Sequence, residues 1–424
     1  MKKYLKHLCA VSALTVAVVS PSVVYAQAKA KPVGPIACPD YKRGPTNIPS
    51  QKVGKKVGQA LEFYNNDQVT EALDVLYEIE TSDGFDRAFT DRFIGNLLAT
   101  QNGQGKKSIE FLSKAVASNE LNDSDQVGTI KLMADLSLQE EEYEEAIKYY
   151  TQWMDVTCKE DFDAYFRISN AYYQTGKFAE IIEPINKAIS LADKPNKTAY
   201  ALKMTSYYNR KMYKETIAVQ EDIVRLFAED KAQWTQLGFF YLLVEDNKKA
   251  LSTFEVAYGQ GYLTKAAEIK ALSQLYTMND IPIKAAKILE EHIESGLIEK
   301  DAKMLTSIAT SYQQAKEFKE AASYYEQSAL LSSDPDMYQK QGVMLYIAER
   351  YNESLVALQK ALDGGSDKVG RIHLTMMEAN FYKGSFKTAY KHVLEAKKDK
   401  STARSARSWE PYIKEKAKNR GITL

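Results

Sequence analysis

A repeat with a period near 35 residues runs through most of the chain and limits its fold more than any other feature. From Val53 onward, a helical stretch, a short polar turn and a second helical stretch recur. A small residue stands early in each second stretch, and successive positions are 33 to 38 residues apart. These positions are Ala72, Ser108, Ala146, Ile181, Thr216, Ala250, Ala285, Ala321, Ser354 and Ala389, of which Ile181 and Thr216 are larger than the pattern asks. A unit of this size buries its apolar face only against its neighbours, so the period predicts a solenoid.

The residues at fixed places within the period resemble those of the tetratricopeptide repeat. The sixth repeat carries the pattern almost complete, as Trp234, Leu237, Gly238, Tyr241, Ala250, Phe254 and Ala257. The resemblance implies an all-α fold. We therefore expect a right-handed α-solenoid of about ten tetratricopeptide helix-turn-helix repeats over residues 53–403, with a C-terminal capping helix.

The first 26 residues have the layout of a secretory signal peptide. Lys2, Lys3 and Lys6 precede a short apolar run, and a small-residue site ends at Ala26. The alternative is a membrane anchor, but a run of about twelve residues is too short for a bilayer that needs ~20. We expect cleavage after Ala26, export to the periplasm, and no membrane span in the mature chain, whose 53 basic and 56 acidic residues give a net charge of −3.

Two further segments flank the repeats. Residues 27–52 form an arm with five of the eleven prolines, which predicts extended backbone. Residues 404–424 are basic and contain Trp409, Tyr412 and Ile413 within one helical turn. This pattern favours a capping helix on the tenth repeat. The alternative is a basic segment that binds anionic lipid or an acidic partner.

The mature chain keeps two cysteines, Cys38 and Cys158, and exported cysteines in even number tend to pair. A disulfide between them would fasten the arm across the first repeats. The alternative is two independently buried thiols.

Little in the sequence points to catalysis or to a cofactor. His292, His373 and His392 stand on different expected helices, without metal-ligand spacing, so we expect no metal site and no cofactor. The acidic run from Glu140 to Glu145 lacks the pattern of a calcium loop and is better explained as solvated surface. A net charge of zero over the whole chain argues against nucleic acid as a partner. We expect a protein that is not an enzyme.

Two short segments resemble periplasmic repeat proteins associated with TonB energy-transduction systems. They run from Arg43 to Val57, at the entry to the repeats, and from Ala403 to Ile413 near the end. The resemblance implies a protein–protein interaction scaffold, accessory to a TonB-dependent outer-membrane uptake system for iron complexes, with TonB-system proteins as partners. The alternatives are a cell-envelope assembly factor acting on peptidoglycan or exported polysaccharide machinery, and an enzyme with a hidden site. The oligomeric state stays open.

In the tetratricopeptide family the first helix of each repeat lines a concave groove. By register, the residues pointing inward in repeats four to six are Phe166, Asn170, Tyr173, Tyr208, Asn209, Thr235 and Phe239. We expect them to bind a peptide or protein, the amides through its backbone and the rings through apolar contact. Phe166 stands where the family's carboxylate clamp has a lysine, which favours an internal or extended segment over a chain end. The alternative is that these rings pack within the array.

Overall fold

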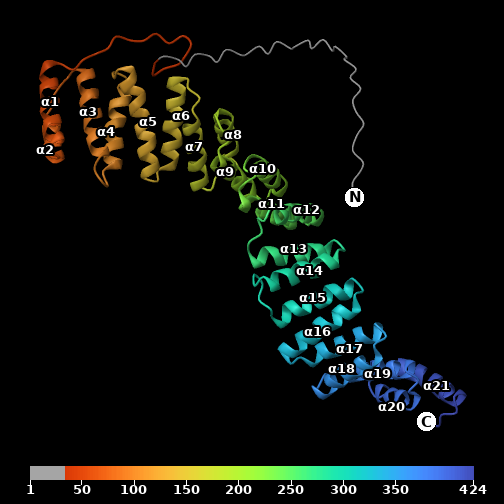
Figure 1. Cartoon of the computed structure of the whole chain (residues 1–424). Coiled ribbons are helices and arrows are strands. Elements are labelled where there is room, and N and C mark those ends of the chain that lie inside the picture. The colour runs from red at the N-terminus through yellow and green to blue at the C-terminus, as the bar shows by residue number, and fades with distance from the viewer. Residues whose placement is uncertain (1–33) are drawn as a thin grey trace, which may run out of the picture. The chain divides into compact units, whose positions relative to one another are not determined.

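The computed structural model describes residues 34–424 and contains, in that part of the chain, 21 α-helices and no strand. The expected signal peptide and residues 27–33 of the arm lie outside the described residues. Twenty helices form ten consecutive pairs and α21 stands alone, which confirms the expected all-α solenoid of helix-turn-helix repeats (Figure 1). None of the helices described is both long and apolar enough to cross a membrane.

The first helices of the ten repeats are α1 (Gln51–Asn65), α3 (Gly84–Ala99), α5 (Asp123–Gln139), α7 (Phe162–Gln174), α9 (Lys197–Asn209), α11 (Lys231–Leu243), α13 (Ala266–Met278), α15 (Ala302–Gln314), α17 (Pro335–Ile347) and α19 (Val369–Tyr382). The second helices are α2 (Val69–Tyr77), α4 (Gly105–Ala117), α6 (Tyr143–Thr157), α8 (Ile182–Leu191), α10 (Tyr213–Leu226), α12 (Asn247–Gly259), α14 (Pro282–Glu294), α16 (Phe318–Ser332), α18 (Tyr351–Asp363) and α20 (Phe386–Ala396). The last helix, α21 (Ala403–Asn419), follows the tenth pair.

The chain forms two compact units, Met1–Ala164 and Tyr165–Leu424, which we call the N-terminal and C-terminal units. The boundary lies inside α7, at the start of the fourth repeat.

All ten positions that define the period are completely buried, with 0% exposure, including the oversized Ile181 and Thr216. In nine repeats this residue is the fourth of the second helix. It faces the first helix of its own repeat, where a small side chain lets the two backbones come close. Ser108 and Ser354 show this directly, since their hydroxyls donate to the carbonyls of Gly95 and Gly342 at 2.7 Å.

The fourth repeat is the exception because α8 begins late. The turn before it extends through Ile181, and the helix starts at Ile182. Pro184 explains this start, since a proline lacks the N–H and its ring clashes with the carbonyl four residues earlier. In the first turn of a helix neither defect matters. The carbonyl of Phe178, left outside the helix, accepts a hydrogen bond from Ser206 of α9 at 2.6 Å.

A left-handed residue stands five positions before the buried period residue in every repeat. It lies two residues past the end of the first helix in nine repeats and four past it in the second, where α3 ends at Ala99. Seven of these ten residues are not glycine: Asp67, Glu141, Lys211, Glu245, Asp280, Lys316 and Glu349. The other three are Gly103, Gly176 and Gly384. A left-handed residue just past a helix terminates it and turns the chain sharply. The left-handed residue at a constant distance from the second helix therefore fixes how that helix begins, at a backbone cost of about 1–2 kcal/mol wherever the residue is not glycine.

A ladder of tyrosines joins successive repeats in the C-terminal unit. The hydroxyls of Tyr276 and Tyr312 donate to Glu255 and Glu290, on the second helix of the preceding repeat, at 3.0 and 2.7 Å. Tyr241 makes the same bond to Glu221. Burial and the adjoining carboxylate raise the pKa of all three tyrosines. Contacts between repeats thus account for these three of the 28 tyrosines.

Gly238 is predicted to be intolerant of even one added methyl group. A Cβ at this position on α11 would overlap the ring of Phe254 on α12, which is completely buried. Overpacking costs ~1–3 kcal/mol and outweighs the ~1 kcal/mol that alanine gains in a helix. We expect Gly238→Ala to lower the free energy of unfolding, measured by urea denaturation. Gly259 on α12 of the same repeat has open space at its Cβ, so Gly259→Ala should instead stabilise by ~0.5–1 kcal/mol. Equal effects of the two changes would contradict this account of the crossing.

The arm lies along the N-terminal unit without a helix or strand over residues 34–50. Its contacts reach the second and third repeats: Ser50 N–H donates to Asp86 at 2.8 Å, Asn47 and Asn122 exchange hydrogen bonds, and Ala37 N–H donates to Thr157 O at 2.7 Å. Helix α1 begins at Gln51, two residues before the expected start of the repeats, because Ser50 caps it. The structure joins Cys38 to Cys158 in a disulfide with Cα atoms 5.0 Å apart.

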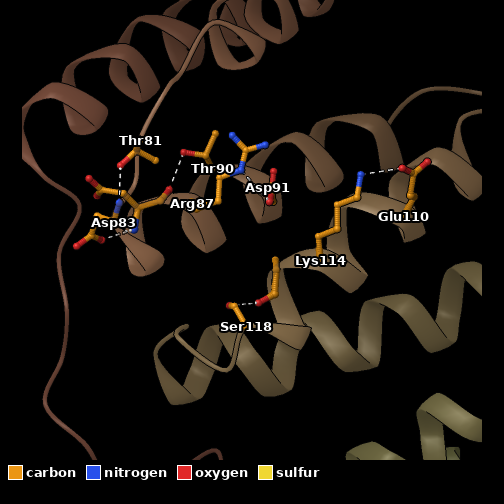
Figure 2. Close-up of polar contacts among 10 residues, drawn as sticks. Thr81, Asp83, Arg87, Thr90, Asp91, Glu110, Lys114 and Ser118 are labelled. Atoms are coloured by element: carbon orange, nitrogen blue, oxygen red, sulfur yellow. Dashed lines mark hydrogen bonds and ion pairs between the residues drawn. The ribbon is translucent and has the colours of Figure 1, made fainter.

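Helix α3 carries a buried carboxylate, Asp91, whose surroundings Figure 2 shows. Asp91 is 4% exposed and pairs at 3.3 Å with Arg87, one turn earlier, while its Oδ1 has no hydrogen-bond partner. Burial raises the pKa of Asp91, and the Arg87 guanidinium opposes that effect. The nearby Lys114–Glu110 pair, at 2.7 Å on α4, is exposed by comparison.

Replacing Asp91 with asparagine should therefore stabilise the N-terminal unit at neutral pH. Because the folded-state pKa lies above the unfolded value, ionised Asp91 lowers stability above its folded-state pKa, and this cost vanishes as pH falls below the unfolded value near ~4. We expect Asp91→Asn to gain about 1 kcal/mol at pH 7 and progressively less toward pH 4, measured by urea denaturation. Glu110→Gln is the control and should change little at either pH. A loss of stability at pH 7 would show that the Arg87 pair outweighs desolvation.

Candidate functional site

A cavity of about 460 Å³ opens on the face formed by the first helices of the fifth and sixth repeats. We call it the aromatic cavity. Its lining comes from α9 and α11 and consists of Met204, Thr205, Tyr208, Thr235, Gln236, Phe239 and Phe240. Rings and a thioether provide most of this wall, and three hydroxyls and one amide provide its polar groups. Pockets that take a ligand have this composition, largely apolar with a few placed polar groups.

The two main rings of the aromatic cavity are exposed but held in place. Tyr208 is 48% exposed and Phe239 is 46% exposed, which is unusual for large apolar side chains. Tyr208 lies 5.8 Å from the ring of Phe240, and Phe239 packs edge-on against the buried Phe254 at 5.2 Å. Rings fixed in this way offer apolar area to a partner at little further cost in conformational entropy.

The structure brings three of the seven sequence-predicted groove residues together at this cavity: Tyr208, Thr235 and Phe239. Asn209 lies at the end of α9, exposed, and its side-chain amide donates to the carbonyl of Thr205 at 2.9 Å. Asn209 therefore caps its own helix and does not line the cavity.

The other three predicted residues, Phe166, Asn170 and Tyr173, lie on α7 and do not line the aromatic cavity. Asn170 is half-buried, and its side-chain amide makes no hydrogen bond with any residue in 34–424. Tyr173 is 39% exposed, with its ring 6.1 Å from that of Phe178. An amide with unused donors and acceptors beside an exposed ring can still bind a peptide backbone.

Sequence reasoning missed a larger hollow of about 600 Å³ in repeats seven to nine, which we call the hydroxyl groove. Its residues come from α13, α14, α15, α16 and the start of α17, and eight of them are serines or threonines: Ser273, Thr277, Thr306, Ser307, Thr310, Ser311, Ser328 and Ser332. Lys270 and Lys303 also line it and form no ion pair within the described chain. The density of hydroxyl residues on α15 is the signal that would have identified this groove.

Helix α21 packs on the tenth repeat through Ala406, Ile413 and Ala417, each 0% exposed. Its Trp409 and Tyr412 rings lie 5.3 and 5.2 Å from the ring of Phe381 on α19. This packing agrees with the expected capping helix.

Comparison with known proteins supports the assignment for two of the ten repeats. Two tetratricopeptide repeat family models match residues 129–163, which hold most of the third repeat, and residues 162–195, which hold the fourth. A search of the curated proteins finds no match to this sequence.

Several solved structures are similar to this chain. One is the C-terminal part of a TPR repeat-containing protein from Cytophaga hutchinsonii, 16% identical, covering 55% of this chain and 95% of its own, with a TM-score of 0.35. A tetratricopeptide repeat protein from Parabacteroides merdae is 12% identical, covering 70% of this chain and 100% of its own, at a TM-score of 0.34. The structure of Naa15/Naa10 bound to HypK-THB is 9% identical, covering 86% of this chain and 66% of that one, at a TM-score of 0.45.

Proposed function

We propose that this chain, a tetratricopeptide repeat protein, is a periplasmic protein–protein interaction scaffold that binds an extended segment of its partner along the first-helix face. The aromatic cavity carries this proposal. Tyrosine and phenylalanine rings that are exposed and already held in place by packing are typical of the residues that dominate protein interfaces. The hydroxyls of Thr205 and Thr235 donate to carbonyls of their own helices, so their oxygens can accept from a partner main chain, while the amide of Gln236 can both donate and accept.

Location in the periplasm is supported by two features of the chain. Residues 1–26 have the composition of a cleaved secretory signal. The Cys38–Cys158 disulfide needs an oxidising compartment to persist, and the bacterial periplasm is one.

Within the periplasm, we propose an accessory role in a TonB-dependent uptake system, with TonB-system proteins as partners. The support is the resemblance of the two segments from Arg43 to Val57 and from Ala403 to Ile413. The first covers the end of the arm and the start of α1, and the second covers most of α21. Arg404 and Arg407 on α21 are exposed and form no ion pair within the part of the chain described, so they are available to a partner.

The test is crosslinking in intact cells followed by fractionation and mass spectrometry. We expect the protein in the periplasmic fraction with Gln27 as its first residue, crosslinked to components of a TonB system. Capture of peptidoglycan or polysaccharide assembly proteins alone would instead favour the envelope-assembly function. Protein retained in the cytoplasm with residues 1–26 intact would contradict the proposal.

A further inference from the structure

Two histidines that are distant in the sequence meet between the helices of the tenth repeat. His373 lies on α19 and His392 on α20, and their Nδ1 atoms are 3.0 Å apart. The ring centroids are 5.2 Å apart. Neither ring has another hydrogen-bond partner among residues 34–424, so water would have to bond the Nε2 atoms.

We propose that His373 and His392 form a binding site for a divalent transition-metal ion, with Cu²⁺ preferred over Zn²⁺. Imidazole nitrogens are good ligands for both metals, and the general order of affinities places Cu²⁺ above Zn²⁺. Metal–nitrogen bonds of ~2.0–2.1 Å place neighbouring nitrogens about 2.9 Å apart in a square plane and about 3.3 Å apart in a tetrahedron. The observed separation of the two Nδ1 atoms is 3.0 Å, which is nearer to the square-planar value.

A metal would lie to one side of the line that joins the two Nδ1 atoms, because bonds of ~2.0–2.1 Å are longer than half of their 3.0 Å separation. Both rings would turn toward the ion, and the hydrogen bond between them would be lost. Both side chains are half-buried, so solvent has access to the pair. Glu395 follows His392 by one helical turn, and its exposed carboxylate pairs with Lys398 at 2.6 Å, so the two histidines alone are the protein ligands of the proposed site.

The protein supplies few ligands to this metal site. The described residues contain no group of three or more His, Cys, Asp or Glu side chains arranged to hold a metal. Water would complete the coordination, so we infer an exchangeable site and not a structural metal centre. A metal bound here would link α19 to α20.

The experiment measures Cu²⁺ binding to untagged, oxidised full-length protein that carries His7→Ala in every sample, so that three histidines remain. Titration calorimetry is expected to find one Cu²⁺ per chain, and electron paramagnetic resonance to find nitrogen coupling. His373→Gln and His392→Gln should each weaken binding at least about tenfold, which is ~1.4 kcal/mol. His292→Gln is the matched control, because His292 lies on α14 and contacts Tyr258 instead. Saturating Cu²⁺ should raise the melting temperature of the parent and of His292→Gln, and should leave that of His373→Gln and His392→Gln unchanged.

Unchanged Cu²⁺ affinity in both His373→Gln and His392→Gln would overturn the proposal, as would the absence of saturable binding up to about 1 mM Cu²⁺. Circular dichroism without metal shows whether the variants remain folded. If a variant is destabilised, the parent's nitrogen coupling and its metal-dependent melting shift still decide the question.

Discussion

Reduction of the Cys38–Cys158 disulfide is expected to destabilise the N-terminal unit more than any single substitution. The bond closes a loop with a sequence separation of 120 residues, which contains the first three repeats. The chain-entropy estimate for such a loop is ~4–5 kcal/mol, an upper figure. The attachment of the arm near Cys38 also depends on the disulfide. The other contacts there are hydrogen bonds from Ala37 N–H to the carbonyl of Thr157 and from the Lys159 ammonium to the carbonyl of Gly34.

The measurement compares urea denaturation of the oxidised protein with that of Cys38→Ser/Cys158→Ser. The variant should lose most of this stability, and limited proteolysis should cut its arm near residues 34–50 first. Thiol titration of the denatured, non-reduced protein should find neither of these two cysteines free. Two titratable thiols there, or a variant as stable as the parent, would contradict the assignment.

Removing both exposed rings from the aromatic cavity is expected to abolish most partner binding without unfolding the protein. Tyr208 and Phe239 are each about half exposed, so truncation leaves little buried void. Aromatic residues at the centre of an interface contribute ~2 kcal/mol or more each, so Tyr208→Ala/Phe239→Ala should weaken affinity by roughly 100- to 1,000-fold. Calorimetry with the captured partner, or with its bound segment, measures this change.

Tyr77→Ala is the matched control for that experiment. Tyr77 is 43% exposed and lies on α2, a second helix of the N-terminal unit. We expect it to leave affinity unchanged, with the melting temperature of all variants close to that of the parent. Loss of affinity in Tyr77→Ala but not in the double variant would place the interface on the second-helix side.

The repeat period predicted the fold well because one geometric requirement sets it. The close crossing of paired helices needs a buried residue at a constant place, and all ten expected places are buried. The left-handed residue in the turn between the paired helices could not be predicted from the sequence. The left-handed turn residue is as regular as the small residue, yet only three of ten are glycine, and side chains such as Lys211 or Glu349 give no local signal of positive φ.

The candidate site was predicted only in part. Register on the first helices identified Tyr208, Thr235 and Phe239, because residues one helical turn apart share a face. It missed Phe240 and Met204, which join the same cavity through packing between neighbouring helices. The histidine pair was missed for a similar reason, since only the folded helix pair of the tenth repeat brings His373 and His392 together.

The most direct test of partner binding at the first-helix face is site-specific photocrosslinking in cells. Benzoylphenylalanine in place of Gln236 would lie in the wall of the aromatic cavity. The same group in place of Leu330, which is 65% exposed on the second helix α16, serves as the comparison. We expect a discrete crosslinked partner from position 236 and none from position 330. A partner captured from position 330 and not from position 236 would contradict binding at the aromatic cavity.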